Sequence, residues 1–282
     1  MLAVLFHSGT VFAAPITFNS AMPVGENDVV FRLNTTTIRA SDDPSALNRD
    51  MTVQATALVG VYGWNQDVTL IGVAPYLDKE QTRSIGSSPR GDVGFGDVKG
   101  FIRYTAYRNN YRRGQTAIAP FFALEAPTGE HEKVGLPRPL QLGSGSWDPI
   151  LGITFQKLGL CEGHFGAVSY QENTEADGFE FGDVYEVNYA YQNVLREYGS
   201  NESYSTLTGL FESSLVVEEK HENNGVKNPN TGGTTLYLSP GIQYVKRRWV
   251  LEGSVQLPVV QNLHGTALEK DFSITVGGRW NF

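Results

Sequence analysis

The C-terminal segment 271–282 alternates between apolar and polar side chains at nearly every residue. One set consists of Phe272, Ile274, Val276, Gly278, Trp280 and Phe282, and the other of Ser273, Thr275, Gly277, Arg279 and Asn281. Successive side chains of a β-strand point to opposite faces of its sheet. The segment is therefore predicted to be a strand with one apolar and one polar face.

The same period-two alternation recurs along the chain, whereas helical periodicity is nearly absent. Twelve strands are predicted, over 29–39, 52–62, 67–78, 98–106, 115–127, 147–157, 163–171, 185–191, 207–217, 236–244, 249–260 and 272–282. The segment 67–78 is apolar on both faces, so its orientation stays open. An even number of sequential strands is typical of an antiparallel meander.

The predicted connections alternate in length. The short ones are 63–66, 108–114, 158–162, 195–203 and 246–248, and the long polar ones are 40–50, 79–92, 128–146, 172–181, 218–233 and 262–268. One edge of the sheet then carries tight turns and the other carries long loops. This is the arrangement of an outer-membrane barrel, whose long loops face the cell exterior.

Composition narrows the class of protein. The net charge of −8 argues against a general nucleic-acid binder, because such a protein needs a basic face. No stretch approaches the ~20 continuous apolar residues of a transmembrane helix. Glycine supplies 31 of 282 residues and charged residues only 18%, which is a glycine-rich and charge-poor mixture compared with average usage.

A soluble β-sandwich alternates in the same way, so the pattern alone leaves two architectures open. Three features favour the barrel. Aromatic residues gather near strand ends, the polar faces hold few lysines, and the chain ends in an apolar strand with Trp280 and Phe282. The fold is predicted to be all-β, an up-and-down antiparallel transmembrane barrel of about twelve strands in the bacterial outer membrane, in contact with its lipid. Trp280 and Phe282 resemble the C-terminal signal that the barrel-assembly machinery reads.

The first charged residue of the chain is Glu26, and an apolar stretch ends in small residues at Ala13 and Ala14. Residues 1–13 are therefore predicted to be a signal peptide, shortened at its basic start, and 14–282 a single barrel domain. The alternative is a buried N-terminal strand. The single Cys161 does not distinguish compartments.

Several short motifs follow one another in a fixed order. They are Val61-Tyr62-Gly63-Trp64, Pro75-Tyr76-Leu77, Gly94-Phe95-Gly96-Asp97-Val98, Leu124-Glu125-Ala126-Pro127-Thr128-Gly129 and Leu142-Gly143-Ser144-Gly145-Ser146-Trp147-Asp148. Over roughly residues 50–282 the chain resembles the family of outer-membrane transporters labelled "MetA-pathway of phenol degradation". The resemblance implies a signal peptide, a barrel and an envelope channel. The chain departs from the family's pattern at Glu125-Ala126, where an apolar or lysine-containing run is more usual before Pro-Thr-Gly.

No arrangement in the sequence predicts catalysis. The five histidines are His7, His131, His164, His221 and His264, and none stands on a predicted strand beside a serine at two-residue spacing. His131, His221 and His264 are expected on exposed loops, and His164 at a tight turn. No metal site, cofactor or nucleic-acid partner is predicted, because no clustered ligand pattern occurs. An outer-membrane lipid-modifying enzyme is kept as the least favoured alternative.

Charged side chains occupy the non-lipid faces of the predicted strands. These candidate lumen residues are Lys99, Arg103, Glu125, Asp148, Glu186, Glu212, Glu252 and Arg279. They either line a solute path or pair across the interior and plug it. Five carboxylates against three basic groups favour cations in an open path.

The predicted function is passive passage of a small solute, aromatic or otherwise hydrophobic, across the outer membrane. The alternative is a structural or adhesive envelope barrel with a closed lumen.

Overall fold

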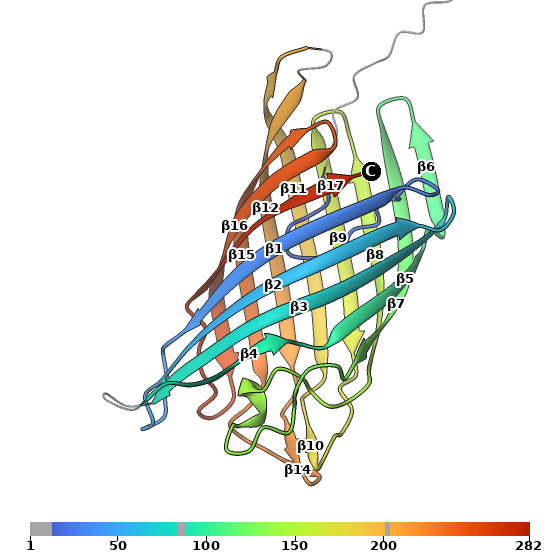
Figure 1. Cartoon of the computed structure of the whole chain (residues 1–282). Coiled ribbons are helices and arrows are strands. Elements are labelled where there is room, and N and C mark those ends of the chain that lie inside the picture. Colours follow the sequence, from blue (N-terminus) through green and yellow to red (C-terminus); the bar gives the residue numbers. More distant parts are fainter. Residues whose placement is uncertain (1–12, 84–87, 201–203) are drawn as a thin grey trace, which may run out of the picture.

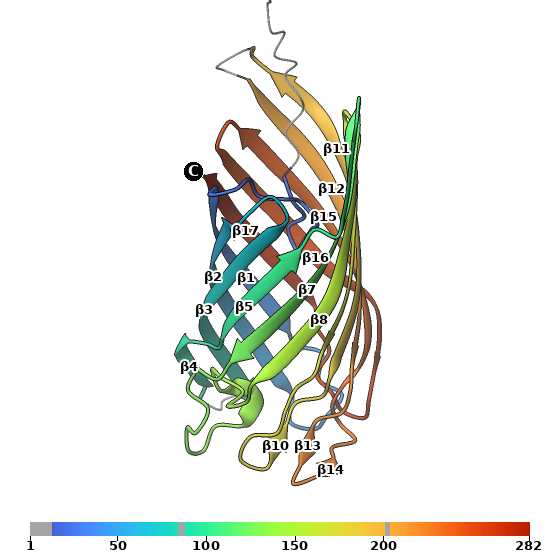
Figure 2. The same cartoon turned by 90° about the vertical axis from the view of Figure 1, so that its right-hand side faces the viewer.

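The computed structural model describes residues 13–83, 88–200 and 204–282, and within them one antiparallel sheet closes on itself as a barrel (Figures 1 and 2). β1 (Val29–Ala40) closes the wall, because it pairs with β2 (Arg49–Gly63) on one side and with β17 (Phe272–Asn281) on the other. The other long strands are β3 (Val68–Arg83), β7 (Gly114–Ala126), β8 (Asp148–Leu158), β9 (Glu162–Gln171), β11 (Val184–Tyr198), β12 (Ser205–Glu218), β15 (Gly233–Lys246) and β16 (Trp249–Leu263). Of the residues described, none belongs to a helix long and apolar enough to cross a membrane.

One position in the wall is filled by three short strands. β4 (Arg90–Phe95) and β5 (Val98–Tyr104) both pair with β3, and β5 and β6 (Tyr107–Tyr111) both pair with β7. Counted as one, they bring the described wall to twelve strands, as predicted from the sequence. The predicted continuous strand 98–106 ends at Tyr104 in the structure, and β6 begins at Tyr107. Thr105 N–H donates to Asp67 O at 2.7 Å, next to the last β3–β5 pair, Val68 and Tyr104.

The outer surface of the barrel is apolar. On β17, Ile274, Val276 and Trp280 are 42%, 62% and 53% exposed, whereas Ser273 and Arg279 are buried. The sheet closes into a barrel, so the buried set faces the interior and the apolar set faces outward. A closed antiparallel barrel with an apolar outer belt is a transmembrane barrel. The predicted fold class and the bacterial outer-membrane location are confirmed. The role of Trp280 and Phe282 in assembly stays a prediction.

The structure shows which side chains of β3 face outward and which face the interior, although both faces of this strand are apolar. Tyr76 is 45% exposed on the outer face, and Ile71 is 7% exposed on the inner face. The inner neighbours Pro75 and Leu77 line a cavity near the loops. The strand is apolar on both sides because the interior of the barrel is itself apolar along this part of the wall. The orientation that the sequence left open for 67–78 is thereby determined.

The two ends of the barrel differ. Short turns such as Arg247-Arg248 lie at the end that carries the C-terminus, which we call the turn end (Figure 1). The opposite, loop end carries the long connections, including η1 (Arg138–Leu140) and a small sheet of β10 (Phe179–Glu180), β13 (Glu222–Asn223) and β14 (Val226–Lys227). The predicted alternation of connection lengths holds for most of the barrel, but the predicted long loop 79–92 is wrong, because β3 continues to Arg83 and β4 begins at Arg90. The direction in which each end faces stays a prediction.

Residues 13–22 run inside the barrel rather than in its wall, and we call them the plug segment. It includes the buried residues Ala13, Ile16 and Ala21. Ala13 packs against Val245 and Val250 of the inner wall. Most of the predicted signal peptide, residues 1–12, lies outside the described residues, so the cleavage site and the domain boundary at 14 stay predictions.

Candidate functional site

A buried carboxylate on β12 binds the main chain of the plug segment. Glu212 is fully buried, and its two carboxylate oxygens accept hydrogen bonds from Ile16 N at 2.7 Å and Thr17 N at 3.2 Å. Alternation along β12 places this side chain inward between the outward residues Phe211 and Ser213. The plug segment thus satisfies a carboxylate that would otherwise lie unpaired inside the barrel.

A second carboxylate lies between two arginines. Glu252 of β16 forms ion pairs with Arg32 of β1 at 2.8 Å and with Arg279 of β17 at 2.6 Å. It also accepts a hydrogen bond from Gln243 Nε2 at 2.9 Å. These charge-assisted hydrogen bonds neutralise the carboxylate and fix both guanidinium groups toward the interior. Arg32 belongs to this group although the sequence analysis did not select it.

The same two arginines hold the plug segment by its carbonyl groups. Arg279 Nη2 donates to Ala14 O at 2.7 Å and to Pro15 O at 2.8 Å, and Arg32 Nη2 donates to Ile16 O at 2.6 Å. Further along, Arg103 of β5 donates to the carbonyl groups of Ser20 and Met22. These contacts reach main-chain atoms, so they depend little on the side chains of the plug segment.

Other predicted lumen residues lie toward the loop end. Lys99 and Glu125 form an ion pair at 2.7 Å, and Glu125 also accepts from Gln171 Nε2 at 3.1 Å. Glu186 accepts from Asn188 Nδ2 at 3.3 Å. The structure therefore brings most of the predicted charges into interior contacts, and whether they line a solute path stays a prediction.

Asp148 lines a cavity at the loop end and also holds a loop, and whether it faces a solute path stays a prediction. Its buried carboxylate accepts from Ser146 Oγ at 3.1 Å and from Thr174 N at 2.7 Å. It faces the interior beside a cavity, and it also ties the loop 172–183 to the start of β8. Its hydrogen bonds therefore order a loop rather than balance a lumen cation.

Asp97 is a structural residue that the sequence analysis did not select. It accepts from Gly129 N at 2.8 Å, Ser144 N at 2.6 Å and Ser144 Oγ at 3.1 Å. A Cβ atom at Gly143 would lie 2.5 Å from Gly129 O, so the loop closes this tightly only around glycine. Three of the motifs that carry the family resemblance thus meet in one loop anchor. The fixed order of these motifs along the chain is the feature of the sequence from which this contact could have been suspected.

Three cavities follow one another through the interior. The loop-end cavity has a volume of about 380 Å³ and shares Lys99 and Gln171 with a middle cavity of about 320 Å³. The middle cavity shares Phe18 and Asn19 with a turn-end cavity of about 330 Å³. Two plug-segment side chains therefore separate the last two compartments.

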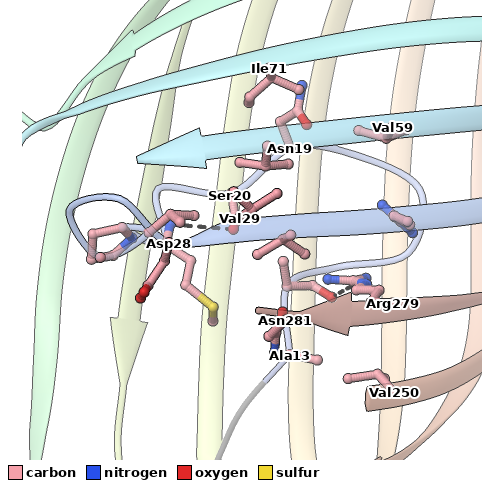
Figure 3. Close-up of a pocket in the computed structure, with 18 of the residues that line it drawn as sticks. Ala13, Asn19, Ser20, Asp28, Val29, Val59, Ile71, Val250, Arg279 and Asn281 are labelled. Carbon is pink, nitrogen blue, oxygen red and sulfur yellow. Dashed lines mark hydrogen bonds between the residues drawn. The ribbon is translucent and has the colours of Figure 1, made fainter. Parts of the chain in front are cut away.

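Figure 3 shows the turn-end cavity around the plug segment. Val59, Ile71 and Val250 contribute apolar side chains from three different strands, and Arg279 lies beside them. The middle cavity is lined by Phe101, Phe121, Ile150 and Glu186 among others, so it is apolar on one part of its wall and polar on another. Both compartments can accommodate a small molecule with an apolar body.

His221 is buried in the loops, although the sequence analysis expected it on the surface. Its Nδ1 accepts a hydrogen bond from Gly182 N at 2.9 Å, and the ring of Phe181 lies 5.2 Å away. Burial lowers the pKa of His221, and the nearby Glu218 carboxylate, 3.7 Å from Nε2, opposes this effect less strongly. Phe181, Gly182 and Glu218 also line the loop-end cavity, so this histidine supports the cavity mouth.

Acid is expected to loosen this loop contact. A protonated Nδ1 becomes a donor, so it can no longer accept from Gly182 N. Because the pKa of His221 is lowered from 6.5, the contact is fully stabilising above that pH and is lost as the pH falls below it. We expect the hydrogen-exchange protection of the Gly182 amide, corrected for intrinsic rates, to fall as the pH is lowered from 7.5 to 5.

The variant His221→Gln provides the control, because its amide oxygen can accept from Gly182 N and does not titrate. Its protection at Gly182 should not change with pH. Both proteins keep the other charged side chains of the small sheet, which are Glu180, Glu222 and Lys227, so any pH dependence that comes from them is the same in both. Equal pH dependence in both proteins would show that another group controls the loop.

Comparison with known proteins shows the fold. No protein-family model and no curated protein matches the chain. The chain is similar to the solved COG4313 outer membrane channel from Pseudomonas putida F1, at 12% sequence identity and a TM-score of 0.75, over 95% of this chain and 100% of that one. Two autotransporter barrels match at 10% identity and a TM-score of 0.47. They are the beta domain of Bordetella Brka, over 91% of this chain and 100% of that one, and the translocator domain of NalP from Neisseria meningitidis, over 92% and 90%. The channel predicted from the motif resemblance is thereby confirmed at the level of its fold: the chain has the β-barrel fold of a bacterial outer-membrane channel.

Proposed function

We propose that this barrel is a passive conduit for small hydrophobic or aromatic solutes across the outer membrane. The observation that carries the proposal is the series of three cavities from the loop end to the turn end, each sharing side chains with the next. A chain of compartments gives a solute a succession of weak sites rather than one strong site. Such multi-site binding permits both entry and release.

The apolar part of the interior favours a solute of low polarity. Phe101 and Phe121 lie with ring centroids 6.0 Å apart, and Phe18 of the plug segment and Ile150 line the same compartment. A wall of this kind stabilises apolar surface removed from water. A solved structure with a similar barrel is described as an outer membrane channel, which agrees with the proposal.

The competing function is a structural or adhesive barrel with a closed lumen. The observation that favours it is the plug segment, which is held by Glu212, Arg279, Arg32 and Arg103. In our proposal the plug segment moves aside during passage, and in the competing one it stays in place. That the protein is not an enzyme and that the barrel-assembly machinery inserts it both stay predictions.

Uptake by intact cells distinguishes these functions. Cells that express the protein should accumulate radiolabelled naphthalene several-fold faster than cells without it, because the polar outer leaflet slows such solutes. Phe121→Ser should remove most of this gain, since it replaces an apolar wall of the middle cavity by a hydroxyl.

The neighbouring residue supplies a matched control. Phe122 is 45% exposed on the outer face, so Phe122→Ser should leave uptake unchanged at equal amounts of folded barrel. Heat-modifiability on gels reports that amount. An uptake rate that is the same with and without the protein would exclude the conduit and favour the closed envelope barrel.

A further inference from the structure

The turn-end cavity contains a buried cation that has no carboxylate partner in the described part of the chain. Arg103 is 5% exposed, and its two terminal nitrogens donate to the carbonyl groups of Ser20 and Met22. Its Nε is buried and has no hydrogen-bond partner among the described residues. The guanidinium group is therefore only partly satisfied.

Two other arginines of this cavity, Arg32 and Arg279, share the carboxylate of Glu252, and Lys99 pairs with Glu125. Lys79 belongs to a different compartment, because it lines the loop-end cavity and donates to the carbonyl groups of Pro139 and Gln141. Asp28 lines the same cavity as Arg103, yet no ion pair joins the two in the described chain. Carbonyl groups solvate a guanidinium but do not cancel its charge. A buried charge without an opposite charge is costly, so this site favours an anion.

The surroundings of Arg103 define the rest of the ligand. The cavity has a volume of about 330 Å³, and its wall includes Val59, Ile71, Val250 and Phe18. This space accommodates one ring or a short chain in apolar contact. A phosphate carries more charge than one guanidinium neutralises, whereas a carboxylate carries a single charge and suits the guanidinium geometry.

We propose that the turn-end cavity binds a small carboxylate with an apolar body, whose anionic group lies against Arg103 and whose ring or chain lies against the valine wall. The inference rests on the proposed function, because it names a substrate class for the same path. It also reverses the expectation from the count of charges, which favoured cations. Three of the lumen carboxylates are already occupied: Glu125 by Lys99, Glu252 by Arg32 and Arg279, and Glu212 by main-chain N–H groups.

Three probes of one shape and different charge test the proposal. They are 4-fluorobenzoate, 4-fluorobenzamide and 4-fluorobenzylamine, and their binding to the purified full-length protein in detergent is measured by ¹⁹F NMR titration at pH 7.5. The carboxylate should bind at least about tenfold more tightly than the neutral amide, and the amine should bind more weakly than either. Equal affinity for the carboxylate and the amide would overturn the proposal.

Two variants locate the site. Arg103→Met should abolish the preference for the carboxylate, whereas Arg108→Met should retain it, since Arg108 pairs with the exposed Asp67 outside the cavity. Val59→Phe fills the cavity and leaves every contact of Arg103 in place, so it should weaken 4-fluorobenzoate binding even if Arg103→Met fails to fold. An affinity for 4-fluorobenzoate that is unchanged in Val59→Phe would overturn the assignment of the cavity.

These results separate the inference from the proposed function. A protein that takes up naphthalene but binds the carboxylate and the amide equally would retain its proposed function and lose this site. A protein that prefers the carboxylate through Arg103 but gives no uptake would retain the site and lose the conduit.

Discussion

Deletion of residues 15–22 is expected to raise the single-channel conductance of the barrel several-fold in planar bilayers. The reason is that these residues cross the interior and separate the middle cavity from the turn-end cavity through Phe18 and Asn19. The deletion retains Ala13 and Ala14, so the predicted cleavage site is kept. Without the plug segment, water and ions should fill a continuous path.

Two substitutions test how the plug segment is held by Glu212 without deleting any residue. Ile16→Pro removes the N–H that donates to Glu212 at 2.7 Å, whereas Ile16→Ala keeps it. Ile16→Pro should open the channel more often, and Ile16→Ala should behave almost like the wild type. If deletion and both substitutions leave conductance unchanged, the plug segment does not limit ion flow.

Replacement of Glu252 by Gln should destabilise the barrel by about 3–5 kcal/mol, because it leaves two buried arginines without their carboxylate. Arg32 and Arg279 have side chains that are 16% and 9% exposed, so water compensates little for the lost charge. The free energy of unfolding is measured by urea titration in lipid vesicles.

Glu186→Gln is the matched control. Glu186 lies inside the same barrel, but among the described contacts it accepts only from Asn188, at 3.3 Å. Its replacement should change the free energy of unfolding by about 0.5 kcal/mol or less. Equal losses in both variants would mean that the Glu252 cluster contributes no more than an isolated lumen carboxylate.

Three of the family motifs are joined by Asp97, whose carboxylate accepts from Gly129 N and Ser144 N. The sequence showed the order of these motifs and not this contact. Their purpose was not predictable, because hydrogen bonds between segments more than thirty residues apart leave no periodic trace. Alternation likewise placed Asp148 on the inner face, but it did not reveal that its carboxylate accepts from Thr174 N and so holds a loop.

Alternation assigned the lumen charges to the inner face of the wall, but their partners were not predictable. Alternation assigns Glu212 and Glu252 to the polar face, because an outward carboxylate would meet hydrocarbon. It does not reveal that Arg32 reaches Glu252 across 220 residues of sequence. Arg32 lies in a strand whose alternation is weak, so no pattern separated it from the residues around it.

The amino-acid sequence by itself determined the wall of this barrel: twelve strands, their order as a meander, the face that each side chain of β17 takes, and the alternation of turns and loops. It could do so because strand periodicity is local, and a shift by one residue would expose polar groups to lipid. Only the tertiary structure decided what fills the interior. The plug segment has no periodicity, and it is held through main-chain atoms that every residue shares. Its place inside the barrel, and the unpaired charge of Arg103 beside it, follow from the closure of the wall around it.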